Sequence, residues 1–154
     1  MDALIIPGGE STTIGKLAAR YEIIPKLRVR AAAGMPVWGT CAGAIFLSRE
    51  VPGHPHPLAA LMDMTVERNA FGRQVDSFEA DLRVVELGVE PFHAVFIRSP
   101  KITRLGHGVQ ALATLEDGTV VAARQGRLLA TSFHPELTSD ARFHRFFLSF
   151  AERY

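Results

Sequence analysis

The segment Gly39-Thr40-Cys41-Ala42-Gly43 constrains the fold of this chain more than any other feature, because it joins an apolar run at 36–40 to a helical pattern at 42–49. A nucleophile between a strand and a helix sits on a sharp turn, and only small residues fit two positions away on either side. We therefore expect Cys41 at the end of a buried strand, with its sulfur above the carboxyl edge of a sheet. The N-terminus of the following helix should favour a thiolate there.

Cys41 also has a simpler interpretation, since a free cysteine is most often a small buried hydrophobic residue. The two flanking glycines and the strand-to-helix context favour the nucleophile. Cys41 is the only cysteine, so no intramolecular disulfide can form, and with no secretory-type start the sequence predicts a cytoplasmic protein.

Short apolar runs alternate with helical patterns, which predicts an α/β fold with a doubly wound, mostly parallel sheet. The strand-rich middle of the chain should add an antiparallel extension, with a hairpin turn at 116–118. Ser11, Thr12 and Thr13 are expected to cap the first helix. The predicted strands are 3–6, 36–40, 64–67, 80–86, 94–98, 109–115, 120–124 and 128–133, and the predicted helices are 13–21, 23–33, 42–49 and 140–154. In the last helix, Phe143, Phe146, Phe147 and Phe150 share one face, which indicates core packing.

His134-Pro135-Glu136 follows the last predicted strand and supplies the base and the orienting group that a thiolate nucleophile needs. Residues i and i+2 of an extended segment point the same way, so His134 and Glu136 are expected on one face. Pro135 favours extended geometry at His134.

The loop Pro7-Gly8-Gly9-Glu10-Ser11 follows the first predicted strand. Its backbone N–H groups are candidates for an oxyanion hole, together with the N–H of Ala42. The stretch from Gly9 to Lys16 only approximates a phosphate-binding loop. It has five residues instead of four before Gly-Lys, and Leu17 stands where Ser or Thr is required, so a nucleoside triphosphate site is rejected.

The composition of the chain excludes several classes of protein. The chain has 154 residues, 47% hydrophobic, and a net charge of +1, which fits one compact domain over residues 1–154 and excludes an intrinsically disordered chain. A nucleic-acid binder would carry a basic excess, and no apolar run approaches the ~20 residues that span a bilayer. His54 and His56 lack a third ligand at a fitting spacing, so neither a metal nor a cofactor is expected.

Longer motifs resemble one family. Gly39–Gly43 with His134-Pro135-Glu136 resembles the class I, triad-type glutamine amidotransferases, which have a flavodoxin-like α/β fold. The narrower resemblance, from residue 2 to the C-terminus, is to the glutaminase subunits of pyridoxal 5′-phosphate synthase. The blocks that carry it are 7–13, 67–74, 77–79, 96–100 and 132–138.

The resemblance implies hydrolysis of L-glutamine to L-glutamate and ammonia, with ammonia passed to a synthase subunit that makes pyridoxal phosphate (vitamin B6). It implies a triad in which Cys41 is the nucleophile that forms a glutamyl thioester, His134 the base and Glu136 its orienting group. It also implies that Gly9 and Ala42 form the oxyanion hole. The implied glutamine-binding residues are Gly9, Glu10, Ser11, Arg68, Ile97 and Arg98.

One departure from the family pattern is the start of the chain, which matches the family's third element. The chain is therefore expected to lack an N-terminal strand–helix unit, either because the start site is mis-assigned or because the protein is truncated. That departure motivates an alternative in which the chain is a catalytically silent subunit that only binds the synthase. A different triad amidotransferase is the other alternative.

Overall fold

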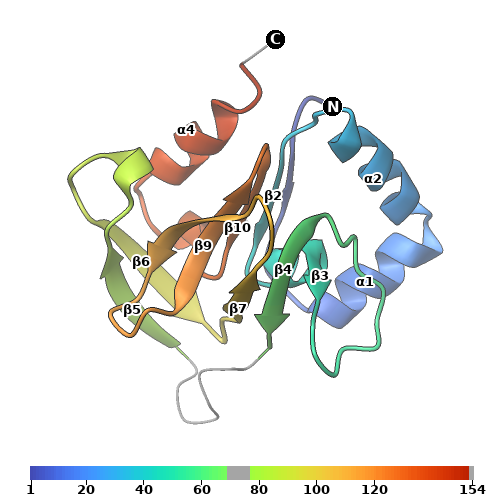
Figure 1. Cartoon of the computed structure of the whole chain (residues 1–154), viewed down its shortest axis with the longest axis horizontal. Coiled ribbons are helices and arrows are strands. Elements are labelled where there is room, and N and C mark those ends of the chain that lie inside the picture. Colours follow the sequence, from blue (N-terminus) through green and yellow to red (C-terminus); the bar gives the residue numbers. More distant parts are fainter. Residues whose placement is uncertain (69–76, 153–154) are drawn as a thin grey trace.

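The computed structural model describes residues 1–68 and 77–152, and its centre is an eight-stranded mixed sheet with helices on both faces (Figure 1). In spatial order the main path is β1 (Leu4–Ile6), β2 (Val37–Thr40), β10 (Leu128–Thr131), β9 (Val120–Gln125), β7 (Lys101–Leu105), β4 (Met62–Glu67) and β3 (Ser48–Glu50). β8 (Gln110–Thr114) pairs with β9, and β5 (Ser77–Leu82) and β6 (Phe92–Ile97) form a separate antiparallel pair.

The predicted α/β class with an antiparallel extension is confirmed, although the sheet has fewer parallel pairs than expected. Parallel pairing is confined to β1–β2, β2–β10 and β3–β4. The pairs β10–β9, β9–β7, β9–β8 and β7–β4 are antiparallel. Short connections suit antiparallel neighbours such as β8–β9 and β9–β10, whereas a parallel pair needs a long crossover.

The described residues form four α-helices, and three of them differ in extent from the prediction. α2 (Ile23–Ala32) matches closely and is followed by Gly34 at φ 97°. α3 (Ala42–Leu47) is shorter than predicted, because residues 48–50 leave the helix to form β3. α4 (Arg142–Leu148) is also shorter, and residues 153–154 lie outside the described residues.

The start of α1 (Ser11–Arg20) corrects the predicted cap. Glu10, and not Ser11, Thr12 or Thr13, is the N-cap residue. Its carboxylate accepts hydrogen bonds from the backbone N–H groups of Thr12 (3.1 Å) and Thr13 (2.9 Å). The glutamate side chain extends forward over the first turn and satisfies two amides that the helix itself leaves unpaired.

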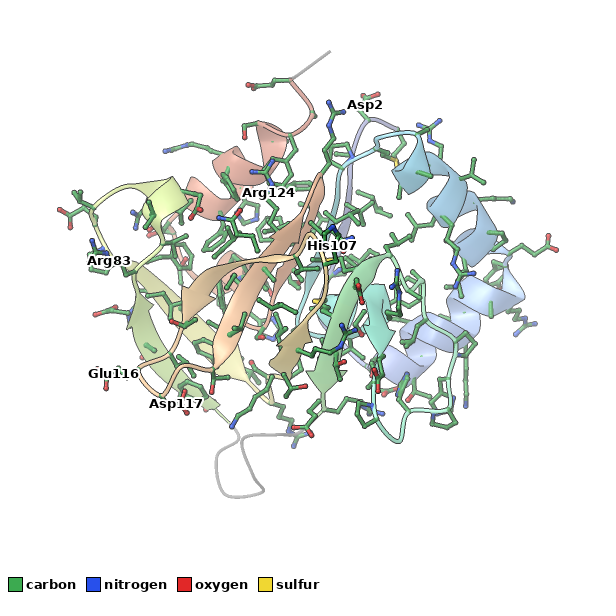
Figure 2. The ribbon with its side chains drawn as sticks, viewed as in Figure 1. Asp2, Arg83, His107, Glu116, Asp117 and Arg124 are labelled. Atoms are coloured by element: carbon green, nitrogen blue, oxygen red, sulfur yellow. The ribbon has the colours of Figure 1, made fainter. Side chains whose placement is uncertain are left out.

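The strand predictions missed two strands and displaced one. β3 and β7 are too polar to show an apolar period, since Arg49, Glu50 and Arg104 face solvent. The run predicted as a strand at 80–86 is divided between β5 and a 3₁₀ turn at Val85–Leu87. The hairpin turn at 116–118 is confirmed. It lies at an exposed corner (Figure 2), where Asp117 Oδ1 accepts from Thr119 N at 2.9 Å and Gly118 has φ 85°.

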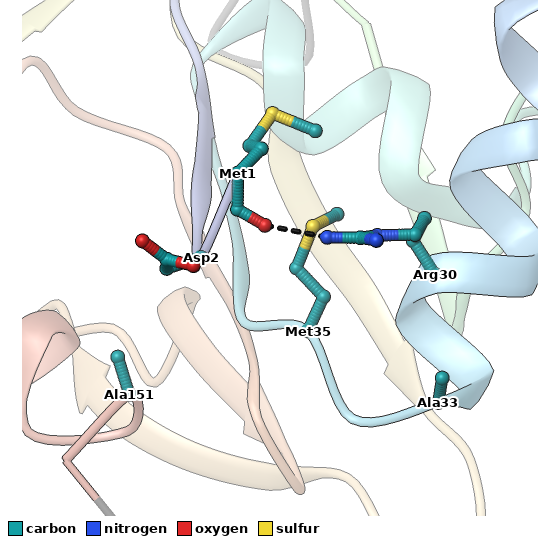
Figure 3. Close-up of a pocket in the computed structure, with 6 residues that line it drawn as sticks. All are labelled: Met1, Asp2, Arg30, Ala33, Met35 and Ala151. Atoms are coloured by element: carbon teal, nitrogen blue, oxygen red, sulfur yellow. Dashed lines mark hydrogen bonds between the residues drawn. The ribbon is translucent and has the colours of Figure 1, made fainter.

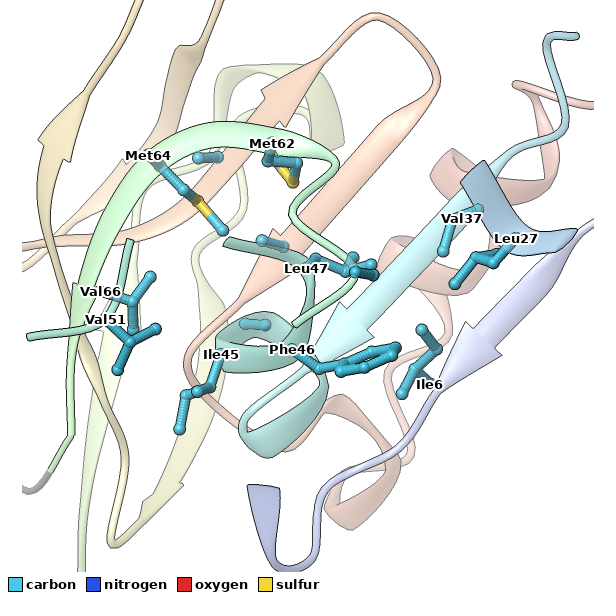
Figure 4. Close-up of a cluster of buried hydrophobic side chains, with 14 of the residues drawn as sticks. Ile6, Leu27, Val37, Ile45, Phe46, Leu47, Val51, Met62, Met64 and Val66 are labelled. Atoms are coloured by element: carbon cyan, nitrogen blue, oxygen red, sulfur yellow. The ribbon is translucent and has the colours of Figure 1, made fainter. Parts of the chain in front are cut away.

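Two hydrophobic cores cover the two faces of the sheet. Val37 packs in the core beneath α1, α2 and α3 (Figure 4), and the next residue, Trp38, packs in the core beneath α4, because successive strand residues point to opposite faces. Phe143, Phe147 and Phe150 are buried in the second core, and Phe146 packs against it, so the predicted core packing is confirmed, although Phe150 lies just beyond the end of α4. Over residues 1–68 and 77–152, no helix has the length and apolar character to cross a membrane.

Candidate functional site

The turn between β2 and α3 has the geometry that the two glycines predicted. Cys41 has φ 51° and ψ −107°, in a region that L-residues rarely adopt. Its N–H donates to the carbonyl of Thr131 at 2.8 Å, which ties the turn to the end of β10. A Cβ on Gly39 would clash with the backbone of Gly43, and a Cβ on Gly43 would clash with the carbonyl of Ile6. The strained conformation is therefore held by close backbone packing on both sides.

The thiol of Cys41 is buried, with the residue 7% exposed. Burial raises the pKa of this thiol to about 11, and although the backbone N–H of Ala42 opposes the shift, the charge of Glu136 adds to it. The protonated thiol fits its surroundings, since Sγ donates to the carbonyl of Ile97 at 3.9 Å. The expected effect of the helix N-terminus on the thiolate is thus outweighed by desolvation in the chain alone.

His134 and Glu136 form the expected pair, with 2.7 Å between His134 Nδ1 and Glu136 Oε1. His134 is extended (φ −107°, ψ 90°), and its N–H donates to the carbonyl of Val95 at 2.9 Å. The pair does not arise from a fully extended segment as predicted. A 3₁₀ turn over Pro135–Leu137 follows His134 and carries Glu136 back to the imidazole.

Gly8 lies close to the side chains of both Cys41 and His134. A Cβ on Gly8 would be 2.6 Å from His134 Cε1 and 3.5 Å from Cys41 Cβ. Both residues therefore lie against Gly8, although they follow two strands, β2 and β10, that are far apart in the sequence. The sequence predicts Gly8 only as part of the glycine-rich loop, and its contact with His134 comes from the tertiary structure.

A pocket of about 260 Å³ opens beside the sulfur. Ile97 does not line it, and contributes only its backbone carbonyl beside Sγ. Arg98 has φ 46°, an unusual backbone conformation for a residue other than glycine. The pocket is lined by Gly9, Glu10, Ser11, Cys41, Ala42, Ile45, Arg68 and Arg98, so the fold brings together all but one of the predicted binding residues.

The pocket wall carries a negative side chain, Glu10, and a positive one, Arg68. Glu10 is ionised across the physiological range, because the hydrogen bonds from the Thr12 and Thr13 backbone lower its pKa to about 2. The guanidinium of Arg68 lies 3.7 Å from Glu10 Oε1 and donates to His54 Nδ1 at 3.0 Å. The sequence predicts no such contact for His54, because residues 54 and 68 are far apart along the chain and only the fold brings them together.

Larger hollows lie away from this site. One of about 450 Å³ is lined by Met1, Asp2, Arg30, Ala33, Met35 and Ala151, and there Arg30 donates to the carbonyl of Met1 at 2.6 Å (Figure 3). It contains none of the predicted site residues. Within the described part of the chain, no three His, Cys, Asp or Glu side chains are grouped to hold a metal ion.

Comparison with known proteins agrees with the geometry. The model of the SNO glutamine amidotransferase family matches residues 1–153. This chain belongs to the SNO glutamine amidotransferase family. Block 67–74, which contributed to the resemblance, lies outside the described residues from 69 onward.

Individual relatives in this family are similar over most of their length. Pyridoxal 5′-phosphate synthase subunit PdxT of Herpetosiphon aurantiacus is 60% identical over 151 residues, which cover 96% of this chain and 80% of that protein. The protein of the same name from a Roseiflexus species is 59% identical over 151 residues, covering 97% and 80%.

Solved structures agree with this assignment. A crystal structure of a glutamine amidotransferase superposes with a TM-score of 0.92 at 55% identity, covering 98% of this chain and 79% of that one. A putative GMP synthase subunit from Thermoplasma acidophilum, at 16% identity and a TM-score of 0.65, shares the fold alone and covers 98% and 73%.

Proposed function

We propose that this protein is the glutaminase subunit of a pyridoxal 5′-phosphate synthase, which hydrolyses L-glutamine to L-glutamate and ammonia in the cytoplasm. The family and the PdxT relatives support the choice of reaction. The observation that carries it is that Cys41 and His134 both lie against Gly8, with Glu136 Oε1 bound to Nδ1 of the imidazole.

In the proposed first step, the Cys41 sulfur attacks the side-chain amide carbon of glutamine while His134 accepts the thiol proton. The tetrahedral intermediate then collapses as His134 returns that proton to the amide nitrogen, and ammonia leaves. A glutamyl thioester remains on Cys41, and water activated by His134 hydrolyses it to glutamate and the free thiol. Glu136 holds the imidazole through Nδ1, which leaves Nε2 for proton transfer.

The negative charge of the intermediate requires N–H donors near the sulfur. We assign this task to the N–H groups of Gly9 and Ala42, both of which line the pocket. Gly9 has φ 140°, a conformation that favours glycine, and apart from its two chain neighbours no described residue has an atom within 4 Å of the position of its Cβ. Open space on that side leaves room for the loop to adjust when substrate or a partner arrives.

The charged wall suits the other end of glutamine, which carries an ammonium and a carboxylate. Arg68 and Arg98 are placed to receive the carboxylate, and the ionised Glu10 is placed to receive the ammonium. Ser11, at the start of α1, and the backbone at Ile97 complete the proposed binding surface.

The raised pKa of Cys41 supports dependence on a partner. At neutral pH the thiol is protonated in the chain alone, and we propose that substrate and docking of a synthase subunit favour proton transfer to His134. We propose that the ammonia passes to the same synthase.

The test is ammonia release from glutamine by the chain, alone and with the synthase subunit, against Cys41→Ala. Release that rises with the partner and disappears in Cys41→Ala is the expected result. Release at the original rate by Cys41→Ala would overturn the triad. If the folded wild-type chain binds the synthase but releases no ammonia in the complex, the protein is a silent binding subunit.

A further inference from the structure

The side chains of His54, Arg68 and Glu10 come from separate segments and form a row of contacts at the edge of the pocket. His54 lies in the connection between β3 and β4, Arg68 directly follows β4, and Glu10 precedes α1. Arg68 Nη1 lies 3.0 Å from His54 Nδ1, and Arg68 Nη2 lies 3.7 Å from Glu10 Oε1. The guanidinium is therefore held from two sides.

The Glu10 end of this row of contacts is held rigidly. Besides its bonds to the Thr12 and Thr13 backbone, Glu10 accepts a hydrogen bond from Thr13 Oγ1 at 2.9 Å. Its carboxylate is therefore fixed by the helix it caps. Arg68 is itself 35% exposed on a flexible stem, and its exposed ion pair with Glu10 is too weak to hold one conformation. The second anchor, on the His54 side, then decides where the guanidinium points.

That anchor needs a neutral imidazole. A guanidinium has only donors, so Nδ1 of His54 must accept, and the ring proton must reside on Nε2. His54 Nε2 is buried and has no hydrogen-bond partner among the described residues. A second proton on the ring would occupy Nδ1, replace the hydrogen bond with repulsion between two cations, and release Arg68.

We propose that His54 is a positioning residue for glutamine: its neutral imidazole holds Arg68 in the pocket, and protonation of the ring lowers the affinity for glutamine. The proposal rests on the proposed glutaminase function. The charged and titratable groups that face His54 are Arg68, His56 and Glu10.

The surroundings of His54 favour the neutral ring. Burial, the charge of Arg68 and neighbouring His56 lower the pKa of His54 below its usual value of 6.5, while Glu10 opposes them. The anchor is thus intact at neutral pH and is lost as the pH falls through this lowered pKa.

Steady-state glutaminase kinetics with the synthase subunit present test the proposal through three variants. His54→Ala removes the acceptor, and His54→Asn keeps an acceptor near the Nδ1 position but cannot titrate. His56→Asn is the matched control, because His56 contacts the His54 ring (centroids 5.1 Å apart) but is not the acceptor for Arg68. At pH 8 we expect KM for glutamine to rise roughly tenfold in His54→Ala with kcat nearly unchanged, a typical effect of losing a hydrogen bond to a charged group. KM should stay within about twofold of wild type in the other two.

The dependence of KM on pH distinguishes the proposed role from a merely structural role of His54, which would not depend on pH. Wild-type KM should rise as the pH falls through the lowered pKa of His54, and KM of His54→Asn should stay flat over the same range. An unchanged KM in His54→Ala, an equal rise in His56→Asn, or parallel KM profiles of wild type and His54→Asn would each overturn the proposal. Wild-type protein without any glutaminase activity would instead refute the proposed function.

Discussion

Gly8 and His134 are in such close contact that the imidazole occupies the space beside a bare backbone. A Cβ on Gly8 would be 2.6 Å from Cε1 and 3.2 Å from Nδ1 of His134. The ring cannot simply move away, because Nδ1 is bound to Glu136 at 2.7 Å.

Gly8→Ala is therefore expected to damage catalysis more than folding. Gly8 is not among the residues with positive φ, so its backbone tolerates alanine, and the added methyl must displace the imidazole. A displacement near 1 Å can lower kcat by about a hundredfold. Rates of ammonia release, compared with thermal unfolding of the same variant, check this. Wild-type activity in Gly8→Ala would show that the ring position above Gly8 is not the working one.

His134→Asn and Glu136→Gln should differ in severity. The first removes the group that moves the proton, and the second only weakens the hold on Nδ1. We expect Glu136→Gln to retain roughly tenfold to a hundredfold more activity than His134→Asn. The measurement is kcat with the synthase subunit present. Equal losses in both variants would mean that Glu136 does more than orient the ring.

The thiol of Cys41 should react slowly with iodoacetamide in the chain alone. With a pKa of about 11, the thiolate is scarce at pH 7 and its fraction rises about tenfold with each pH unit below that value. Alkylation followed by mass spectrometry from pH 7 to 10 should show that slope. A rate that levels off near pH 8 would contradict the raised pKa. The synthase subunit should increase the rate at pH 7 if docking activates the thiol.

Glu10 should contribute to stability over a defined pH range. Its pKa falls from 4.5 to about 2 on folding, so its contribution is complete above pH 4.5 and is lost as the pH falls towards 2. Thermal unfolding of wild type and Glu10→Gln should therefore differ at pH 6 and converge near pH 2. Glu116→Gln makes the same chemical change at the exposed hairpin corner and should match wild type throughout. A constant difference between wild type and Glu10→Gln down to pH 2 would exclude the carboxylate as its source.

Substitutions at two neighbouring residues of α4 distinguish the contribution of core packing to stability from that of helix propensity. Phe147 is 1% exposed and packs on Trp38 with ring centroids 5.5 Å apart, whereas Leu148 is 55% exposed. Phe147→Ala should lower the free energy of unfolding by about 3–5 kcal/mol, and Leu148→Ala by less than about 0.5 kcal/mol. Denaturant titration measures both. Similar effects from the two variants would place α4 off the sheet.

The elements with strong local signals were predictable from the sequence. The turn at Cys41 follows from glycine spacing, since the clashes around Gly39 and Gly43 arise wherever a strand turns this sharply into a helix. The aromatic face of α4 follows from helical periodicity. β3 and β7 have no such signal, because their strand conformation comes from pairing with β4 and β9 and not from their own residues.

The sequence by itself determined which residues are proposed for the chemistry: Cys41 on its sharp turn, the adjacent pair His134 and Glu136, and the glycine-rich loop. Residue type and short spacing suffice for these, because covalent geometry limits how near neighbours along the chain can be arranged. Only the tertiary structure decided how they meet. The parallel register of β2 and β10, which pairs Thr40 with Thr131, brings Cys41 to His134. The raised pKa of Cys41 and the bond between His54 and Arg68 depend on burial and on contacts between distant segments, which no local pattern encodes.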